Sequence, residues 1–144
     1  MKYFTIDELT RSSEAKRRGI DNTPSQNATA NLKALVENIL DPLREMWGKP
    51  IKVNSGYRCP KLNAAVGGSS QSSHMSGCAA DITTGTQKAN GELLELLIGS
   101  GLPYTKVIDE QYCSWIHITF IKGKPRRENI KAVKKNGKWI YSKM

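Results

Sequence analysis

The sequence predicts a single α+β domain, with an antiparallel sheet and helices packed on it. Strand-like alternation and a hairpin signal at Asn136-Gly137 are concentrated in the later part of the chain. Helix-like apolar spacing appears earlier, between residues 28 and 47. A chain of 144 residues is long enough for one hydrophobic core, so we expect residues 1–144 to form one domain. The apolar positions that repeat every three or four residues are Leu32, Leu35, Val36, Ile39, Leu40, Leu43 and Met46.

The first elements are defined by capping signals. Thr5 and Glu8 match a capping box, which predicts a short helix that begins after Thr5. The helix over residues 28–47 contains Pro42, which is expected to kink or restart it, and Gly48 marks its end.

The remaining elements are short and alternate between strand and helix. Glycines and prolines separate them, and threonine or proline stands where helices are expected to begin. The expected elements are a strand at 51–53, a helix from Pro60 to Val66, a strand at 78–83, a helix capped by Thr86 and ended by residues 99–101, and strands at 104–108 and 115–121 joined by a turn at 109–114.

The net charge of +9 is concentrated at the C-terminal end. Residues 122–144 contain nine Lys or Arg and one acidic residue, a surplus of eight positive charges. This predicted hairpin extension is either attracted to a polyanion or serves as a solubilising surface, and the sequence leaves both open. Nucleic acid is disfavoured as the polyanion, because few aromatic residues alternate with the basic ones and no reader motif is present.

The cysteine count and the hydropathy pattern indicate the compartment. Cys59, Cys78 and Cys113 cannot all pair within one chain, which favours a reducing environment. The first residues lack the apolar run of a signal peptide, and no segment is long and apolar enough to span a membrane. We therefore expect a monomeric protein with no export signal and no membrane association.

The chain contains only two histidines, and both lie among small or apolar residues. His74 precedes Asp81 in a segment of small residues, and His117 lies in a predicted strand. Two neutral imidazoles and one carboxylate form the ligand set of a catalytic zinc, which leaves one coordination position open. The alternative is that each histidine is a hydrogen-bonded structural residue.

A second metal site is also conceivable from spacing alone. The pairs His74-x-x-x-Cys78 and Cys113-x-x-x-His117 match a structural Cys2His2 zinc site. This alternative leaves Asp81 without a role.

Several motifs, taken in order, resemble the zinc D-Ala-D-Ala carboxypeptidase family. That family includes phage endolysins that cut L-alanyl-D-glutamate bonds and D-alanyl-D-alanine dipeptidases, and the resemblance implies a fold of the hedgehog and DD-peptidase type over residues 4–121. Segments 4–9 and 19–24 resemble its smaller, phage-associated branch. The motifs are Ser55-Gly56-Tyr57-Arg58, residues 62–68, Ser72-x-His74-x-x-Gly77-x-Ala79-x-Asp81 and Trp115-x-His117.

The resemblance implies roles for individual residues. His74, Asp81 and His117 would bind zinc. Arg58 would bind the carbonyl or terminal carboxylate of the substrate, and Ser72 would lie beside the substrate.

The catalytic base of the family is an acidic residue a few positions before the last histidine. Here Ser114 and Gln111 occupy the commonest spacings, so Glu110 is the expected base and Asp109 the second candidate.

The implied function is a zinc peptidase that cuts a peptide bond in peptidoglycan stem peptides. It is of the D-Ala-D-Ala carboxypeptidase or the L-Ala-D-Glu endopeptidase type, and resembles a phage endolysin made in the host cytoplasm and released to the cell wall. The basic extension at 122–144 would then bind the anionic wall. The alternative is a non-catalytic wall-binding domain or a structural zinc domain.

Overall fold

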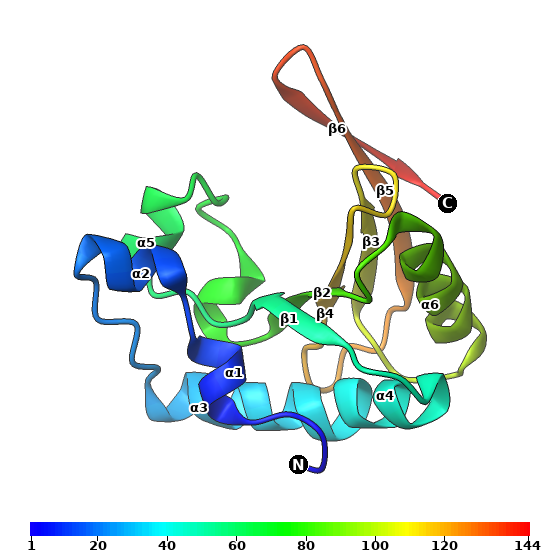
Figure 1. The fold of residues 1–144 in the computed structure, drawn as a ribbon, viewed down its shortest axis with the longest axis horizontal. Helices are drawn as coiled ribbons and strands as arrows, with labels where there is room; N and C mark the ends of the chain where they lie inside the picture. The colour runs from blue at the N-terminus through cyan, green and yellow to red at the C-terminus, as the bar shows by residue number, and fades with distance from the viewer.

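The computed structural model describes residues 1–144, which form an α+β domain built on one six-stranded sheet (Figure 1). The strand order is β1-β2-β4-β3-β5-β6, and every neighbouring pair is antiparallel except β3 and β5. The parallel pair arises because the chain leaves β4, passes the adjacent β3, and enters β5 on its far side. The strands are β1 (Lys52–Ser55), β2 (Ala79–Thr83), β3 (Lys106–Glu110), β4 (Trp115–Thr119), β5 (Glu128–Lys135) and β6 (Lys138–Lys143).

The capping box at the first helix is confirmed. Thr5 Oγ1 accepts a hydrogen bond from Glu8 N at 3.2 Å, and Glu8 Oε1 accepts one from Thr5 N at 3.3 Å. The helices are α1 (Ile6–Thr10), α2 (Ser13–Arg18), α3 (Gln26–Leu35), the π-helical η1 (Val36–Leu40), α4 (Asp41–Trp47), α5 (Pro60–Ala65), the 3-10 turn η2 (Ser73–Ser76) and α6 (Gln87–Gly99). Helix α2 was not predicted, although Ser12 caps its start and Gly19 its end.

The long amphipathic helix is continuous through Pro42 rather than broken there. Segments α3, η1 and α4 follow one another directly, and the Asp41 N–H bonds to the Val36 carbonyl five residues earlier. The expected kink or restart therefore takes the form of a π-turn. The wider turn before Pro42 lets the helix continue although proline has no N–H to donate. Gly48, with φ of 75°, ends the helix as predicted.

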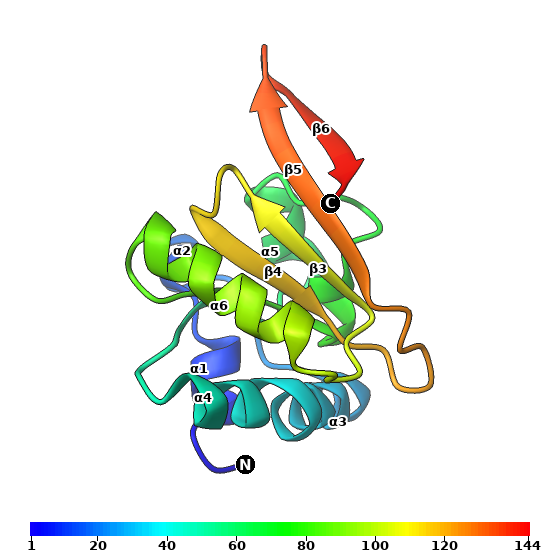
Figure 2. The same ribbon diagram turned by 90° about the vertical axis from the view of Figure 1, so that its right-hand side faces the viewer.

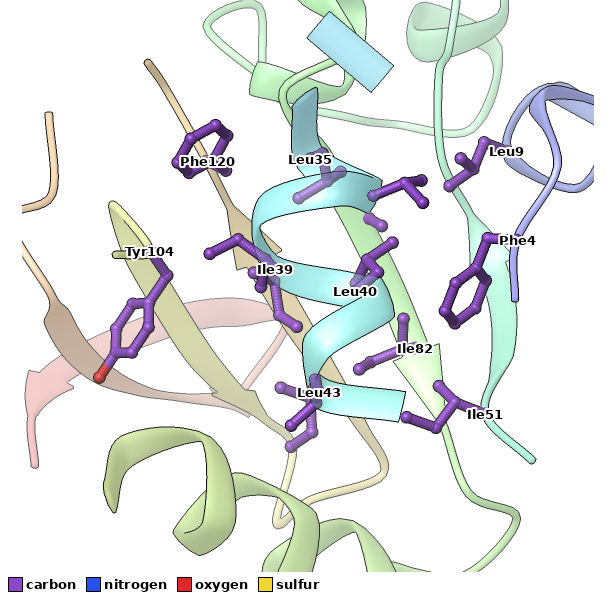
Figure 3. Close-up of a cluster of buried hydrophobic side chains, with 14 of the residues drawn as sticks. Phe4, Leu9, Leu35, Ile39, Leu40, Leu43, Ile51, Ile82, Tyr104 and Phe120 are labelled. Atoms are coloured by element: carbon purple, nitrogen blue, oxygen red, sulfur yellow. The ribbon is translucent and has the colours of Figure 1, made fainter. Parts of the chain in front are cut away.

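The hydrophobic core lies between the α3–η1–α4 helix, helix α6 and one face of the sheet (Figures 2 and 3). Leu35, Ile39, Leu40 and Leu43 form the buried stripe of the long helix. On the sheet, Ala80, Ile82, Val107, Ile116 and Ile118 point into this core. Because side chains alternate along a strand, the residues between them point to the opposite face.

The C-terminal hairpin forms as predicted. Asn136 and Gly137 have φ of 52° and 76°, which suits the tight turn between β5 and β6. In Figure 1 the hairpin extends away from the helical layer, at the far edge of the sheet from β1. No helix in the structure has the length and apolar character needed to cross a membrane.

Candidate metal centre

Asp81 and His117 are brought together by the pairing of β2 with β4. The two residues occupy directly opposite positions in the antiparallel register, and His117 Nδ1 lies 3.0 Å from Asp81 Oδ1. Their neighbours Ala80 and Ile118 are fully buried in the core on the other face. Core packing therefore directs the carboxylate and the imidazole to the face away from the helices.

His74 reaches the same point from the 3-10 turn η2. Its Nε2 lies 3.3 Å from Asp81 Oδ2, and its Nδ1 lies 2.6 Å from the Gly56 carbonyl oxygen. A carbonyl can only accept, so Nδ1 carries the proton and donates it to Gly56. The Nε2 lone pair is left buried and without a hydrogen-bond partner, in a side chain that is 2% exposed. Such an orphaned nitrogen is well suited to bind a metal ion.

The three side chains form a compact ligand set. One ligand atom from each of His74, Asp81 and His117 lies within 4.8 Å of the other two. The predicted ligands thus meet in one place, and two imidazoles with one carboxylate match the donors of a catalytic zinc site. Thr119 Oγ1 lies 2.8 Å from His117 Nε2, so it can orient the ring when Nδ1 binds a metal.

The Cys2His2 alternative does not form. Neither Cys78 nor Cys113 belongs to the ligand cluster. Cys113 instead packs against the hydrophobic core, and all three cysteines are free thiols. The strand that follows η2 brings Asp81, and not Cys78, to the histidines.

The charges of the cluster depend on one another. Burial acts to raise the pKa of Asp81, but the hydrogen bond with His117 and the proximity of His74 outweigh it and hold that pKa well below its usual range. Burial lowers the pKa of His117, against the opposing effect of the Asp81 carboxylate. These shifts favour an ionised Asp81 beside a neutral His117, the protonation states that metal binding requires of these two side chains.

The loop that carries Gly56 and Arg58 is fixed by backbone contacts. Arg58 N donates to the His74 carbonyl at 3.0 Å, and Tyr57 N donates to the Leu9 carbonyl at 2.7 Å. Gly56 lies so close to Leu9 that a Cβ at this position would collide with the Leu9 carbonyl. The Asn22 side chain bonds the backbone of this loop on both sides, at Tyr57 O and Cys59 N, a positioning role that the sequence did not suggest.

An open pocket of about 680 Å³ lies over the ligand cluster. The predicted substrate residues Arg58 and Ser72 both line it. Arg58 Nε is buried without a partner; burial lowers the pKa of this guanidinium, and the Asp81 carboxylate opposes the shift. Ser72 Oγ accepts from His74 N at 3.2 Å, so it also fixes the turn that presents His74.

Glu110 lines the pocket, whereas Asp109 does not. Glu110 is the last residue of β3, opposite Trp115 and on the same face as His117. Asp109 points to the other face, is 9% exposed and accepts a hydrogen bond from Cys113 N at 2.6 Å. The geometry thus favours Glu110 over Asp109 as the base.

The environment of Glu110 suits proton transfer. Burial, together with the negative charges of Asp81 and Asp109, raises the pKa of Glu110 to about 7, against the opposing effect of Lys106. A carboxyl group with a pKa near the working pH can both accept and return a proton. The turn expected at 109–114 begins later, at Gln111, because the strand continues through Glu110; three successive residues with φ of 49°, 56° and 59° then reverse the chain.

Among the pocket residues that were not predicted as site residues, three large side chains lie on β3 and β6. Lys106 lies on β3, while Trp139 and Tyr141 come from β6. The alternation of Trp139 and Tyr141 indicates a shared strand face, but the sequence does not show which edge of the sheet β6 joins.

Comparison with known proteins agrees with this geometry. Residues 2–119 match the family model of Peptidase M15. A segment of 86 residues is 48% identical to the zinc D-Ala-D-Ala carboxypeptidase of Streptomyces albus G. The alignment covers 58% of this chain and 32% of that protein, so the chain matches about a third of its relative's length.

Proposed function

Because this chain belongs to the peptidase M15 family, we propose that it is a zinc peptidase that hydrolyses a peptide bond in bacterial peptidoglycan. The observation that carries the proposal is the convergence of the orphaned His74 Nε2, Asp81 and His117 beside a carboxyl group, Glu110, of raised pKa. The name of the Streptomyces albus G relative supports both the metal and the class of substrate.

In this proposal His74, Asp81 and His117 bind the zinc ion through Nε2, a carboxylate oxygen and Nδ1. Zinc, when bound, supplies a Lewis acid that polarises the scissile carbonyl and acidifies water at its open coordination position. The Gly56 carbonyl accepts from His74 Nδ1 and so leaves His74 Nε2 unprotonated. His117 Nδ1 faces the Asp81 carboxylate in this structure, and the Thr119 hydroxyl can accept from Nε2 once the metal takes the place of the proton on Nδ1.

Glu110 and Arg58 act on the substrate. Glu110 takes a proton from the attacking water and passes it to the nitrogen of the leaving amine. The Arg58 guanidinium, which lines the pocket, donates to the developing oxyanion or to a substrate carboxylate. Ser72 presents its hydroxyl at the same wall of the pocket.

Two bonds are compatible with this machinery. A D-Ala-D-Ala carboxypeptidase would place the terminal carboxylate of the stem peptide on Arg58, and similarity to the Streptomyces albus G carboxypeptidase favours this activity. An L-Ala-D-Glu endopeptidase would place an internal carbonyl there. The second activity fits the phage endolysin role implied by segments 4–9 and 19–24, in which the enzyme accumulates in the host cytoplasm before its release to the wall.

Digestion of purified peptidoglycan tests the proposal and identifies the bond. Wild-type protein should release fragments whose masses show the loss of terminal D-alanine or cleavage after L-alanine, and a chelator should stop the release. Glu110→Gln should lose activity while retaining zinc, and Glu95→Gln, an exposed acid on helix α6, should match the wild type. Absence of cleavage by zinc-loaded wild-type protein on several wall chemistries would favour the non-catalytic wall-binding domain.

Lysis separates a trimming enzyme from an endolysin. Removal of a terminal D-alanine leaves the cross-linked network intact, whereas cleavage within the stem peptide opens it. A fall in turbidity of permeabilised bacteria on addition of the protein would therefore support the endopeptidase role, and release of D-alanine at constant turbidity would support the carboxypeptidase.

A further inference from the structure

The C-terminal hairpin forms part of the pocket wall, although both of its strands lie beyond the family match that ends at Thr119. Trp139 and Tyr141 of β6 line the pocket together with Glu110 and Trp115. The hairpin therefore lies outside the matched residues and still reaches the candidate active site.

The sheet register explains how Tyr141 approaches Glu110. Glu110 pairs with Ala132 in the parallel β3–β5 ladder, and Ala132 pairs with Tyr141 in the antiparallel β5–β6 ladder. The three residues form one row on the face that carries the metal ligands. Ala132 is fully buried and has only a methyl group, so the larger side chains on either side of it extend over the same space. Burial raises the pKa of Tyr141, and the Glu110 charge adds to the shift.

Trp139 lies in the adjacent row and contacts the strand that carries His117. Its ring centroid is 6.4 Å from that of Trp115, at an interplanar angle of 80°, which is an edge-to-face contact. Trp115 itself pairs with Glu110 across β3 and β4. Trp139 remains 37% exposed and Tyr141 61%, so both rings have free surface within the pocket.

We propose that Trp139 and Tyr141 form a substrate-binding wall that determines which stem peptides the enzyme accepts. This inference rests on the proposed function and adds to it the residues that bind the peptide beside the scissile bond. Peptidoglycan stem peptides combine small aliphatic side chains with carboxylates. The aromatic faces would pack on the aliphatic groups, and Lys106, which also lines the pocket, would pair with a carboxylate.

The wall faces Arg58 and Ser72 across the pocket, because those residues come from the loops that precede β2. A peptide held between the two sides is contacted by a guanidinium on one flank and by aromatic rings on the other. Substitutions in the hairpin would thus alter which stem peptides bind, without changing the residues of the metal centre.

Binding measurements test this wall separately from catalysis. The Glu110→Gln background allows a soluble stem pentapeptide to bind without turnover, and its Kd is measured by calorimetry. Trp139→Ala and Tyr141→Ala should each raise that Kd by about 5- to 10-fold, the effect of losing an aromatic contact. Ile140 lies on the other face of the same strand with an exposure between those of the two aromatic residues, and Ile140→Ala should change the Kd less than about 2-fold.

The outcomes distinguish this inference from the proposed function. Thermal unfolding of each variant checks that the hairpin remains folded, and Trp139→Phe and Tyr141→Phe, which retain a ring, should recover most of the affinity. Equal Kd values for the Trp139, Tyr141 and Ile140 variants, or no binding of the pentapeptide at all, would overturn the wall even if wild-type protein cleaves peptidoglycan. The expected Kd pattern without wild-type cleavage would support the wall as a peptide-binding surface and refute the peptidase.

Discussion

The two oxygens of the Asp81 carboxylate each approach a different histidine, and His117 Nδ1 lies 3.0 Å from Oδ1. His74 Nε2 lies 3.3 Å from the other oxygen, Oδ2. The carboxylate thus draws together two imidazoles that are 43 positions apart in the sequence. Asp81 is the one acidic side chain among the three, so its removal should affect the whole cluster.

Replacement of Asp81 by alanine should abolish tight zinc binding. The loss removes one of three protein ligands and the only anionic one, so we expect the zinc affinity to fall by about 100-fold or more. Metal content after dialysis against a zinc buffer, and competition with a chromophoric chelator, measure the change.

Cys78→Ser is the matched control for this substitution, because Cys78 lies three residues before Asp81 in the same segment. It should retain one zinc per chain. Zinc binding that survives Asp81→Ala and fails in Cys78→Ser would restore the thiolate alternative.

The meeting of His74, Asp81 and His117 could be predicted from the sequence because the pattern that carries it is local. His74 and Asp81 stand in one short motif, and His117 lies in a strand whose alternation separates Ile116 and Ile118 from the histidine. The choice between Glu110 and Asp109 needed the structure, because only the end of β3 determines which of two consecutive acids faces the pocket.

The contribution of the hairpin could not be predicted, because strand order is a long-range property. The signal at Asn136-Gly137 predicted that β5 and β6 pair, and they do. That β5 joins β3 in parallel, and so brings Trp139 and Tyr141 over the site, follows from packing between distant segments that leave no local pattern.

Gly56→Ala should destabilise the fold near the metal centre. The added methyl group would collide with the Leu9 carbonyl, and the backbone that must move carries the Gly56 carbonyl that fixes His74. We expect a loss of about 2 kcal/mol or more in the free energy of unfolding. Urea unfolding followed by circular dichroism measures it.

Gly99→Ala provides the control. Gly99 ends helix α6, and a methyl group there would meet nothing within 4 Å. Alanine at this position should leave stability unchanged or raise it by up to about 1 kcal/mol. Equal effects of the two substitutions would show that the backbone at Gly56 can move away from the Leu9 carbonyl without loss of stability.

The rate of cleavage should rise with pH as Glu110 loses its proton. The raised pKa of about 7 means that an increasing fraction of Glu110 is protonated, and unable to accept a proton, as the pH falls below neutrality. A bound zinc ion favours the ionised carboxylate, so the inflection in kcat/KM should lie at or below about pH 7. A pH profile on a soluble stem peptide measures it. A rate that shows no inflection at any pH below about 7 would assign the base elsewhere.

The same group should make the metal-free protein less stable as the pH rises. Between the ordinary pKa of 4.5 and about 7, the folded protein retains the Glu110 proton that the unfolded chain has lost. The folded state therefore binds more protons, and the free energy of unfolding falls across this window. Glu110→Gln removes this dependence, and above the window it should be more stable than wild type by an amount on the order of 1–2 kcal/mol, a figure reduced because the side chain is only half-buried.

Urea unfolding in the presence of a chelator, at the two ends of this window, measures the effect. Glu95→Gln, which neutralises an exposed carboxylate on α6, controls for the change in net charge. A difference between Glu110→Gln and wild type that stays constant with pH would show that Glu110 titrates alike in the folded and unfolded chains.

The positive charge of the hairpin should increase retention on the anionic cell wall. Lys134, Lys135 and Lys138 are all exposed around its turn, where no acidic residue stands among them. Replacing all three with glutamate reverses their charge. At low salt, this triple variant should sediment with purified walls in a fraction several-fold lower than that of wild type. Raising the salt concentration from about 0.05 M to about 0.5 M should remove most of this difference, because the screening length then falls below the separation of the charges.

The control changes the same net charge at a different place. Lys33, Lys49 and Lys88 are exposed on other elements, and their reversal to glutamate should lower wall binding much less than reversal at the hairpin. If both triple variants lose binding equally, retention depends on the total charge of the protein and not on the hairpin. If wall binding of the wild type is indifferent to salt, electrostatic attraction does not retain the protein at all, and the lysines serve as a solubilising surface.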